Sequence, residues 1–369
     1  MENSHVTKLE IDIEALASNL NYFKSNIFPS TKVLVVVKAF GYGSHSIAIA
    51  QSVKSEVDYF AVAYTDEGLA LKNGAIDTPI MVLHPQKTNL EKIIESNLEP
   101  VIYSLPLLKE FLKITRPRGI KNYPIHIKFN TGLNRLGFKL EDIPKIARLL
   151  DKEQSVSVRS IFSHIAASED SNEDQFTRSQ IQLFEKFTSE FSSSTGFNPI
   201  RHLLNTSGIL NYASEAQFDM VRLGIGLYGF DNLDTEVGAL KNVMTLKSVI
   251  SQIHTIEKGE TVGYNRKFRA NTSVKTATIP IGHADGISRR LGNGVGYVFI
   301  NDQKAPIIGT VCMDMIMVDI TKIDCSEGDE VVIYKDQKHI KKLARAIDTI
   351  PYELLTAISQ RIRRVLKKC

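Results

Sequence analysis

This sequence of 369 residues has no long apolar run, only three cysteines and little excess of charge of either sign. No run reaches the roughly 18 apolar residues of a membrane-spanning helix, so no membrane partner is expected. The first residues, MENSHVTKLEID, lack the apolar core of a secretion signal, which favours a cytoplasmic protein. Cys312, Cys325 and Cys369 have neither disulfide parity nor metal-ligand spacing, so we expect reduced thiols and no metal site.

The charge of the chain is nearly balanced, with a net charge of +4 and 23% charged residues. Because the basic residues form no long stripe, composition gives no reason to expect a nucleic-acid partner. The one basic cluster, RIRRVLKK (361–368), is typical of a solvent-exposed helix end. With 43% hydrophobic residues, the chain has the composition of an ordinary soluble globular protein, and its length allows two domains.

Short apolar runs alternate with helical segments between residues 30 and 230. The runs are VLVVV (33–37), YFAVAY (59–64), IMVLH (80–84), LEPVIY (98–103), IHIKF (125–129), VRSIFSH (158–164), IRHLLN (200–205) and DMVRL (219–223). The segments between them carry helix signals, such as the helix start in TDEGLALKNG and the spaced apolar residues of EDQFTRSQIQLFEKFTSEF. Eight strand-then-helix units in roughly 200 residues predict a TIM (β/α)8 barrel.

The pattern changes after about residue 236. Alternating segments such as MTLKSVISQIHTI, KTATIPIG, GYVFIN and EVVIYKD predict antiparallel strands without regular helices, and PYELLTAISQRIRRVL predicts a final helix. We therefore expect an α/β chain in which a barrel domain (12–236) is followed by a C-terminal, mainly β domain (237–369). The N-terminal strand (1–11) is expected to join the second domain.

Polar residues stand at the ends of the predicted barrel strands, where TIM barrels carry their chemistry. These residues are Lys38, His84, Arg135, His164, Asn205, Thr206, Arg222 and Gly224, and the fifth strand itself contains Lys128. Because the C-terminal ends of all eight strands meet at one rim, we expect these groups to line a common site.

Lys38 comes immediately after VLVVV, the most apolar of these runs, and is the first residue of the glycine-containing turn KAFGYG. A helix is expected to begin near His45. Burial disfavours the ammonium form, so a lysine here can have a lowered pKa and form an imine with a carbonyl compound. A lysine at a strand end can also simply extend to solvent. After the seventh and eighth strands, NTSG (205–208) and GIG (224–226) combine hydroxyls with accessible backbone amides, which favours a phosphorylated ligand.

Segments spread over nearly the whole chain resemble those of the alanine racemase family, in the same order. The segments are VVKAFGYG, KFNTGLNRLGF, SHIAASED, HLLNTSG, MVRLGIGLYG, GETVGYN, VCMDM and TIPYELLTAIS. The resemblance implies a TIM barrel with a C-terminal β domain and bound pyridoxal 5'-phosphate. It also implies interconversion of L-alanine and D-alanine, the latter supplied for peptidoglycan.

The resemblance further implies roles for individual residues. Lys38 would hold the cofactor as an imine and, once substrate displaces it, act as one catalytic base, with Tyr264 as the other. Cofactor-binding residues would be Tyr42, Asn205, Thr206, Ser207, Gly224, Ile225 and Tyr352 toward the phosphate, His164 beside the ring and Arg222 at the ring nitrogen. Substrate-binding residues would be Arg135, Met313, Asp314 and His283, and Lys128 would be a candidate carbamylated lysine. A homodimer would share its active sites, with Tyr264 and Met313 serving the partner.

Four positions, in three segments, depart from the family pattern. Phe40 and Gly41 stand where Asn and Ala are common, which alters packing around the turn. His283 stands where tyrosine is usual, in the segment expected at the substrate entrance, where it can change selectivity, pH dependence or access. Asn130 replaces a more usual aspartate and leaves the carbamylation of Lys128 open.

Two bases on opposite faces of an α-carbon suffice to invert it. Because a guanidinium cannot pass its proton to the ring nitrogen, Arg222 favours prompt reprotonation of the α-carbon, which fits a racemase better than an aminotransferase.

Three alternatives remain. One is a racemase of serine or of several amino acids; the second is a decarboxylase of the same fold, whose longer phosphate loop and cysteine-aspartate motif have no counterpart here. The third is a non-catalytic pyridoxal-phosphate-binding protein, a class that lacks the second domain.

Overall fold

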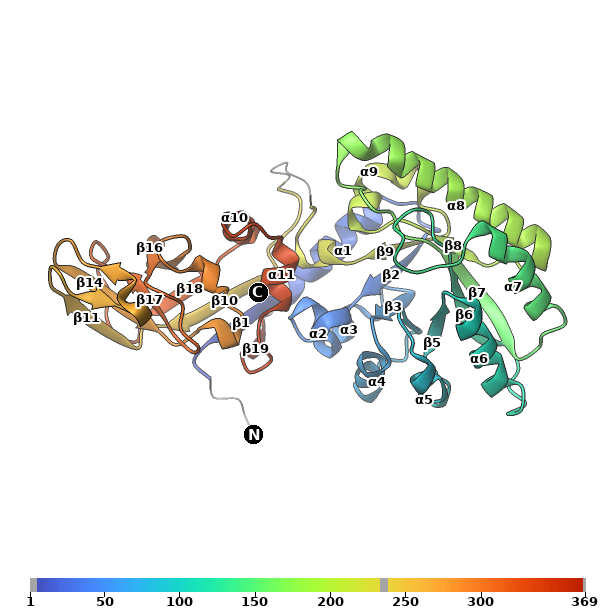
Figure 1. The fold of residues 1–369 in the computed structure, drawn as a ribbon, viewed down its shortest axis with the longest axis horizontal. Helices are drawn as coiled ribbons and strands as arrows, with labels where there is room; N and C mark the ends of the chain where they lie inside the picture. The colour runs from blue at the N-terminus through green and yellow to red at the C-terminus, as the bar shows by residue number, and fades with distance from the viewer. Residues whose placement is uncertain (1–4, 233–237, 368–369) are drawn as a thin grey trace. The chain divides into compact units, whose positions relative to one another are not determined.

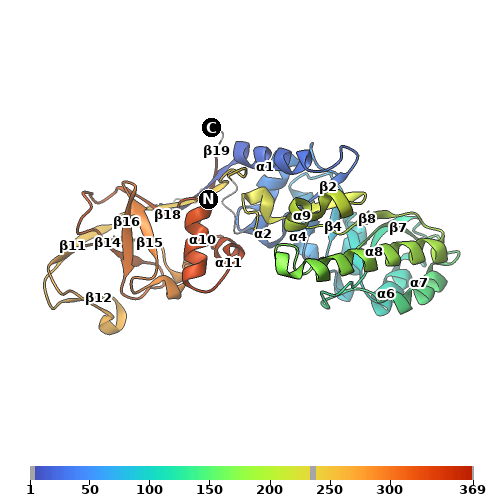
Figure 2. The same ribbon diagram turned by 90° about the horizontal axis from the view of Figure 1, so that it is seen from above.

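The computed structural model describes residues 5–232 and 238–367 and separates the chain into two compact units (Figures 1 and 2). The barrel unit comprises residues 17–41 and 46–240. The β unit comprises residues 1–16, 42–45 and 241–369. The short segment 42–45 belongs to the β unit although it lies between two stretches of the barrel unit.

Eight parallel strands close into a barrel at the centre of the barrel unit. The strands are β2 (Lys32–Val36), β3 (Tyr59–Val62), β4 (Ile80–Val82), β5 (Glu99–Ile102), β6 (Tyr123–Lys128), β7 (Val156–Phe162), β8 (Ile200–His202) and β9 (Met220–Leu223). Each strand pairs with the next, and β9 pairs with β2 to close the ring. The predicted TIM barrel is confirmed, since each of the eight apolar runs overlaps one strand.

Helices follow the strands on the outside of the barrel (Figure 1). They are α1 (Ile13–Ser25), which begins in the β unit, α3 (Ser46–Val53), α4 (Thr65–Asn73), α5 (Leu90–Glu95), α6 (Leu105–Thr115), α7 (Ile143–Leu150), α8 (Asp174–Thr195) and α9 (Thr206–Ala216). In α8, Phe184, Phe187 and Phe191 recur at helical spacing and are buried, and Phe187 stacks on Phe129 with ring centroids 4.4 Å apart. Burying each such ring stabilises the fold by about 1.5–3 kcal/mol.

A nine-stranded sheet forms the β unit, in the order β11-β14-β17-β16-β15-β18-β10-β1-β19. Its strands are β1 (Lys8–Asp12), β10 (Met244–Val249), β11 (Gln252–Ile256), β14 (Val274–Ile279), β15 (Tyr297–Ile300), β16 (Gln303–Ile308), β17 (Ile316–Asp319), β18 (Glu330–Tyr334) and β19 (Arg363–Lys367). A separate hairpin joins β12 (Thr261–Val262) to β13 (Phe268–Arg269). All pairings in the large sheet are antiparallel except that of β1 with β19.

The β unit contains regular helices, which contradicts the expectation that it has none before its end. α10 (Gln337–Ala346) begins after Asp336, whose side chain accepts a hydrogen bond from the backbone amide of His339 at 2.8 Å. Its sequence, QKHIKKLARA, is mostly polar, yet Ile340 and Leu343 recur on one face and are buried. This narrow apolar stripe is enough to pack a helix against the sheet.

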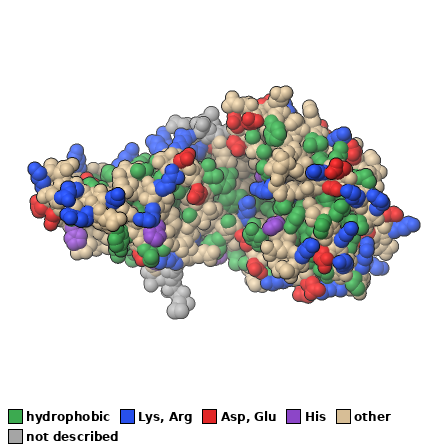
Figure 3. Space-filling view, in the orientation of Figure 1, with side chains coloured by type: hydrophobic (Ala, Val, Ile, Leu, Met, Phe, Trp, Pro, Cys, Tyr) green, Lys and Arg blue, Asp and Glu red, His purple; other side chains and the backbone are tan. Residues whose placement is uncertain are grey.

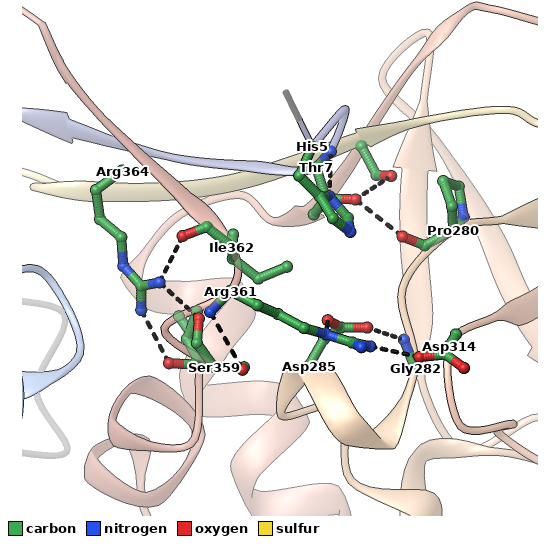
Figure 4. Close-up of polar contacts among 12 residues, drawn as sticks. His5, Thr7, Pro280, Gly282, Asp285, Asp314, Ser359, Arg361, Ile362 and Arg364 are labelled. Carbon is green, nitrogen blue, oxygen red and sulfur yellow. Dashed lines mark hydrogen bonds and ion pairs between the residues drawn. The ribbon is translucent and has the colours of Figure 1, made fainter. Parts of the chain in front are cut away.

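The predicted C-terminal helix is wrong beyond Thr356, where α11 (Pro351–Thr356) ends. The basic segment expected to be a solvated helix end instead forms β19, which pairs in parallel with β1. Arg364 donates to the carbonyl oxygens of Ile358, Ser359 and Ile362 at 2.8, 2.5 and 2.6 Å, as Figure 4 shows in part. These bonds satisfy backbone acceptors that a continuing helix would have satisfied itself, so the chain turns back as a strand.

Within residues 5–232 and 238–367, no helix is both long and apolar enough to cross a membrane. Cys312 and Cys325 are free, and the prediction for Cys369 lies outside the described residues. On the face shown in Figure 3, basic and acidic side chains are interspersed rather than gathered by sign.

Candidate active site

Lys38 follows β2 after one residue, Val37, and begins a left-handed turn in the segment α2 (Lys38–Tyr42). Ala39, Phe40 and Gly41 have φ angles of 52°, 54° and 64°. Left-handed backbone costs about 1–2 kcal/mol for each residue with a side chain, so surrounding contacts must hold it. Within the turn, the amide of Gly41 donates to the carbonyl oxygen of Val37 at 3.0 Å.

Glu67, in the first turn of α4, is the side chain that holds this turn against the next loop. One carboxylate oxygen accepts the amide of Ala39 at 2.6 Å. The other accepts the amides of Ala63 and Tyr64 at 2.7 and 3.2 Å. One carboxylate thus joins the loops after β2 and β3. Sequence reasoning recognised TDEG only as a helix start and missed this second use of the glutamate.

We expect Glu67→Gln to lower the free energy of unfolding by about 1–3 kcal/mol, because an amide group has one acceptor oxygen and would leave a backbone donor unpaired. Urea unfolding followed by circular dichroism measures the change. Asp66→Asn is the matched control, since Asp66 lies in the same helical turn, has a side chain 81% exposed and pairs with Lys92. Equal losses in the two variants would contradict the role given to Glu67.

Lys38, Lys128, Arg135 and Arg222 make the rim of the barrel strongly cationic. Burial and the charge of Arg135 lower the pKa of Lys38, while the nearby charge of Glu67 acts in the opposite direction. Burial and the three neighbouring cations lower the pKa of Lys128 to about 8. Such a rim suits anionic groups, including a carboxylate and a phosphate.

Arg222 lies near the end of β9 and is 4% exposed. Its Nη2 atom donates to the carbonyl oxygens of Ser163 and Leu203 at 2.7 and 2.8 Å and to Nδ1 of His164 at 3.0 Å. Because a guanidinium only donates, Nδ1 of His164 must be unprotonated. Burial, together with the charges of Arg222 and Lys128, also lowers the pKa of His164. Burial lowers the pKa of Arg222 to about 9, so the guanidinium remains charged at neutral pH.

Five of the residues expected at a phosphate lie where α9 begins and in the loop after β9. Asn205 accepts the amide of Gly208 at 2.9 Å and so starts the helix. Thr206 Oγ1 accepts the amides of Gly224 and Gly226 at 3.3 and 3.2 Å. A Cβ added to Gly226 would lie 2.5 Å from the ring of Phe23, so only glycine permits this close packing. Ser207 and Ile225 lie in the same two segments, and both are buried. A helix start flanked by backbone amides is a good anion site.

The β unit brings the predicted residues His283 and Met313 together at η6 (His283–Asp285). The amide of His283 donates to the carbonyl oxygen of Cys312 at 2.9 Å, and that of Ala284 donates to Met313 at 3.0 Å. Met313 is 60% exposed, and Tyr264, in η5 (Tyr264–Arg266), is 70% exposed. These side chains are thus presented at the surface of the unit.

Arg361 links the segment that contains Asp285 to the segment that contains Asp314 (Figure 4). Its guanidinium donates to Asp285 at 2.6 Å and to Asp314 at 2.5 Å. The buried carboxylate of Asp285 also accepts the amide of Gly282 at 2.8 Å. Asp314 therefore pairs with Arg361, and this ion pair orients the chain around the neighbouring Met313. Sequence reasoning assigned Arg361 to a solvated helix end and missed this contact.

Tyr42 and Tyr352 both belong to the β unit, and their ring centroids lie 6.0 Å apart. Burial raises the pKa of the Tyr42 hydroxyl. The hydroxyl therefore stays protonated at neutral pH and can donate a hydrogen bond to an anion.

The predicted site residues thus form two groups, one in each unit. The barrel unit holds Lys38, Lys128, Arg135, His164, Asn205, Thr206, Ser207, Arg222, Gly224 and Ile225, and the β unit holds Tyr42, Tyr264, His283, Met313, Asp314 and Tyr352.

Two family models match this chain. The model of the alanine racemase N-terminal domain matches residues 11–232, and that of the alanine racemase C-terminal domain matches residues 243–366. The chain belongs to the alanine racemase family. The resemblance inferred from the sequence motifs is confirmed, and membership makes the chain an isomerase that depends on pyridoxal phosphate.

Individual members of the alanine racemase family match over nearly the full length. The alanine racemase of Helicobacter pylori is 32% identical over 97% of this chain and 98% of its own. The solved alanine racemase of Clostridium difficile has a TM-score of 0.92 at 31% identity, covering 99% of this chain and 96% of that one. The alanine racemase of Bartonella henselae, solved with covalently bound pyridoxal phosphate, has a TM-score of 0.88 at 28% identity, covering 98% and 99%.

Proposed function

We propose that this chain interconverts L-alanine and D-alanine, with Lys38 and Tyr264 as the two bases. The observation that carries the proposal is the cationic rim of the barrel, where Lys38 has a lowered pKa and lies among Lys128, Arg135 and Arg222. Matches to named alanine racemases over almost the whole chain support the choice of alanine.

The barrel residues fit pyridoxal 5'-phosphate. The start of α9 and the amides after β9 would hold the phosphate, Lys38 would hold the cofactor covalently, and Arg222 would donate to its ring nitrogen. When bound, the cofactor withdraws electrons from the α-carbon of an attached amino acid and makes its proton more acidic.

The protein residues then have separate tasks. The Lys38 amine takes or returns the α-proton on one face, and the Tyr264 hydroxyl does so on the other. Arg135 would bind the substrate carboxylate, and Arg222, which remains protonated, would donate a hydrogen bond to the cofactor ring nitrogen without giving up its proton. Met313 and His283 line the side of the site where the substrate enters.

The deciding experiment is a racemase assay on L-alanine and D-alanine beside serine, lysine and arginine. We expect turnover of both alanine enantiomers above the others. Turnover of serine or of several amino acids would favour the broader racemase instead. Cofactor binding without turnover of any amino acid would favour the non-catalytic alternative.

We propose that Tyr264 and Met313 act in the active site of a second copy, in a homodimer with shared sites. Mixing inactive Lys38→Ala and Tyr264→Phe chains under exchange conditions should then restore about one quarter of the wild-type activity, because half the dimers would carry one intact site. Assays of mixed and unmixed variants at equal total concentration measure this. If mixing restores nothing while native mass spectrometry shows dimers that contain one chain of each variant, the shared site is refuted.

We propose that Lys128 is carbamylated. Its low pKa leaves a substantial neutral amine fraction near pH 8, and the neutral amine is the form that adds carbon dioxide. A carbamate would place a negative charge beside Arg135. We expect a carbamate carbon signal in the NMR spectrum of protein equilibrated with ¹³C-bicarbonate, and its loss in Lys128→Met. The same signal in the variant would assign the carbamate elsewhere.

The pH dependence of stability follows from the same pKa. Because the folded pKa of about 8 lies below the ordinary lysine pKa of 10.5, the unfolded chain holds more protons between these values. Unmodified Lys128 therefore destabilises the fold below pH 8, and this cost is relieved as the pH rises toward 10.5. Carbamylation removes the ammonium and with it this cost.

We further propose that the enzyme works in the cytoplasm and supplies D-alanine for peptidoglycan. Its membership of the alanine racemase family supports this. Rescue of a D-alanine-requiring bacterium by the wild-type gene, and not by a Lys38→Ala gene, would test it.

A further inference from the structure

An unbroken chain of hydrogen bonds runs from Glu99 to Arg222 through the barrel interior, with one side chain from each of the strands β5 to β9. The contacts are Glu99 Oε2 to His126 Nε2 at 2.8 Å, His126 Nδ1 to Ser160 Oγ at 2.7 Å, Ser160 Oγ to His202 Nε2 at 2.9 Å and His202 Nδ1 to Arg222 Nη1 at 2.9 Å. We call these five residues the barrel relay. Sequence reasoning named only Arg222 among them.

The barrel relay is shielded from water along its whole length. His126 and His202 are 0% exposed, and Ser160 is 1% exposed. Leaving any of these polar atoms without a partner would cost free energy, so the network must be complete. Neighbouring rings fix the imidazoles. Phe162 stacks on His202 with centroids 4.7 Å apart, and Tyr59 meets His126 edge-on at 5.8 Å.

The chemistry of Arg222 sets the direction of every bond in the barrel relay. A guanidinium has donors only, so Nδ1 of His202 must accept, and its proton lies on Nε2. That proton goes to the Ser160 oxygen, so the serine hydroxyl donates to Nδ1 of His126. His126 then carries its proton on Nε2 and donates it to Glu99. All donors point from the guanidinium toward the carboxylate, which lets the bonds polarise one another.

The two ends of the barrel relay carry opposite charges. The other acceptors that contact Arg222 are two carbonyl oxygens and His164, so none of them is negatively charged. Among the residues that the structure describes, no acid forms an ion pair with Arg222. Glu99, 8% exposed, is the acid to which it is joined through the network. Burial and the Arg222 charge also lower the pKa of His202, which keeps its acceptor nitrogen available.

We propose that Glu99, His126, Ser160 and His202 are positioning residues that orient the Arg222 guanidinium and supply its remote counter-charge. The proposal rests on the proposed function, because the purpose of that orientation is the contact of Arg222 with the cofactor ring nitrogen. His202 holds Nη1 while backbone carbonyls hold Nη2, so the guanidinium cannot turn in its plane. Its remaining donors then face a fixed direction.

Two variants separate the charge of the barrel relay from its continuity. Glu99→Gln keeps an acceptor oxygen for His126 and removes the negative charge. Ser160→Ala interrupts the network between the two histidines. Ser155→Ala is the control, because Ser155 is also buried and its hydroxyl bonds to Thr115 at 2.8 Å, outside the barrel relay. Glu99→Gln keeps the test decisive if Ser160→Ala folds poorly.

The first measurement is ¹⁵N NMR of the histidine rings in protein without cofactor. We expect wild-type His202 to be neutral with its proton on Nε2, and its ring shifts to move in Glu99→Gln and Ser160→Ala but not in Ser155→Ala. The second is the absorbance band of bound pyridoxal phosphate, which should shift in the first two variants only. A His202 proton on Nδ1, or both relay variants matching Ser155→Ala in both measurements, would overturn the proposal.

Kinetics supply the third measurement. We expect kcat for alanine to fall about tenfold in Glu99→Gln while KM stays within about twofold, since the relay acts on the cofactor contact and not on substrate binding. An unchanged kcat would overturn the proposal. The NMR and absorbance measurements need no racemase activity, so failure of the proposed function would instead show as an inactive wild type whose relay signals are intact.

Discussion

Lys38→Ala should lose the covalently bound cofactor and at least about 10⁴-fold of the racemase kcat, because one residue supplies both the covalent anchor and a base. Two measurements check this. The wild type should show an absorbance band near the visible edge that borohydride abolishes by fixing the cofactor to the lysine, and the variant should lack that band. Mass spectrometry of the reduced wild type should place the added mass on Lys38.

Lys32→Ala is the matched control for this experiment. Lys32 begins the same strand, β2, but is exposed and pairs with Asp58 at 3.1 Å. We expect this variant to keep both the band and the activity, since an exposed ion pair contributes little to stability. A Lys38→Ala protein that retains a borohydride-sensitive band would show that another lysine holds the cofactor.

Tyr264→Phe should lower racemisation by roughly 10²- to 10⁴-fold, because the phenyl ring keeps the shape of the side chain but loses the hydroxyl group that would carry the proton. The remaining base, Lys38, should still exchange the α-proton of one enantiomer with deuterium from the solvent. Proton NMR in D₂O would then show exchange without inversion for one alanine enantiomer and neither process for the other.

Tyr297→Phe provides the control, since Tyr297 lies on β15 of the same unit and packs against His339 with centroids 4.7 Å apart. This variant should racemise as the wild type does. If Tyr264→Phe instead exchanged both enantiomers equally, a second base other than Tyr264 would have to serve that face.

The barrel could be predicted from sequence because its strands are buried on both faces and therefore appear as short apolar runs. The position of Lys38 follows from the same pattern, since parallel strands put their C-terminal ends at one rim. Local patterns were less informative for β19. Its partner, β1, lies at the other end of the chain, and basic residues such as Arg364 satisfy carbonyl oxygens that only the folded structure brings near.

The barrel relay shows a different limit. His126 and Ser160 are polar residues that stand among apolar neighbours in their strands, and this was visible in the sequence. Their pairing was not, because it depends on the stagger of neighbouring strands, which brings His126 opposite Ser160. Glu67 is similar, since its place in a helix start was evident and its bond to the amide of Ala39 required the fold.

The position of β1 within the β unit affects the order in which the chain can fold during synthesis. Lys8 of β1 pairs with Lys247 and with Arg363, and the whole barrel is encoded between β1 and the first of these partners. At about 5–20 residues per second, β1 waits roughly 12 to 50 seconds on the ribosome for β10. During that time Leu9 and Ile11, fully buried in the folded protein, have no strand to cover them. The first strand to leave the ribosome is therefore among the last to be paired, and it needs protection from aggregation until the final residues emerge.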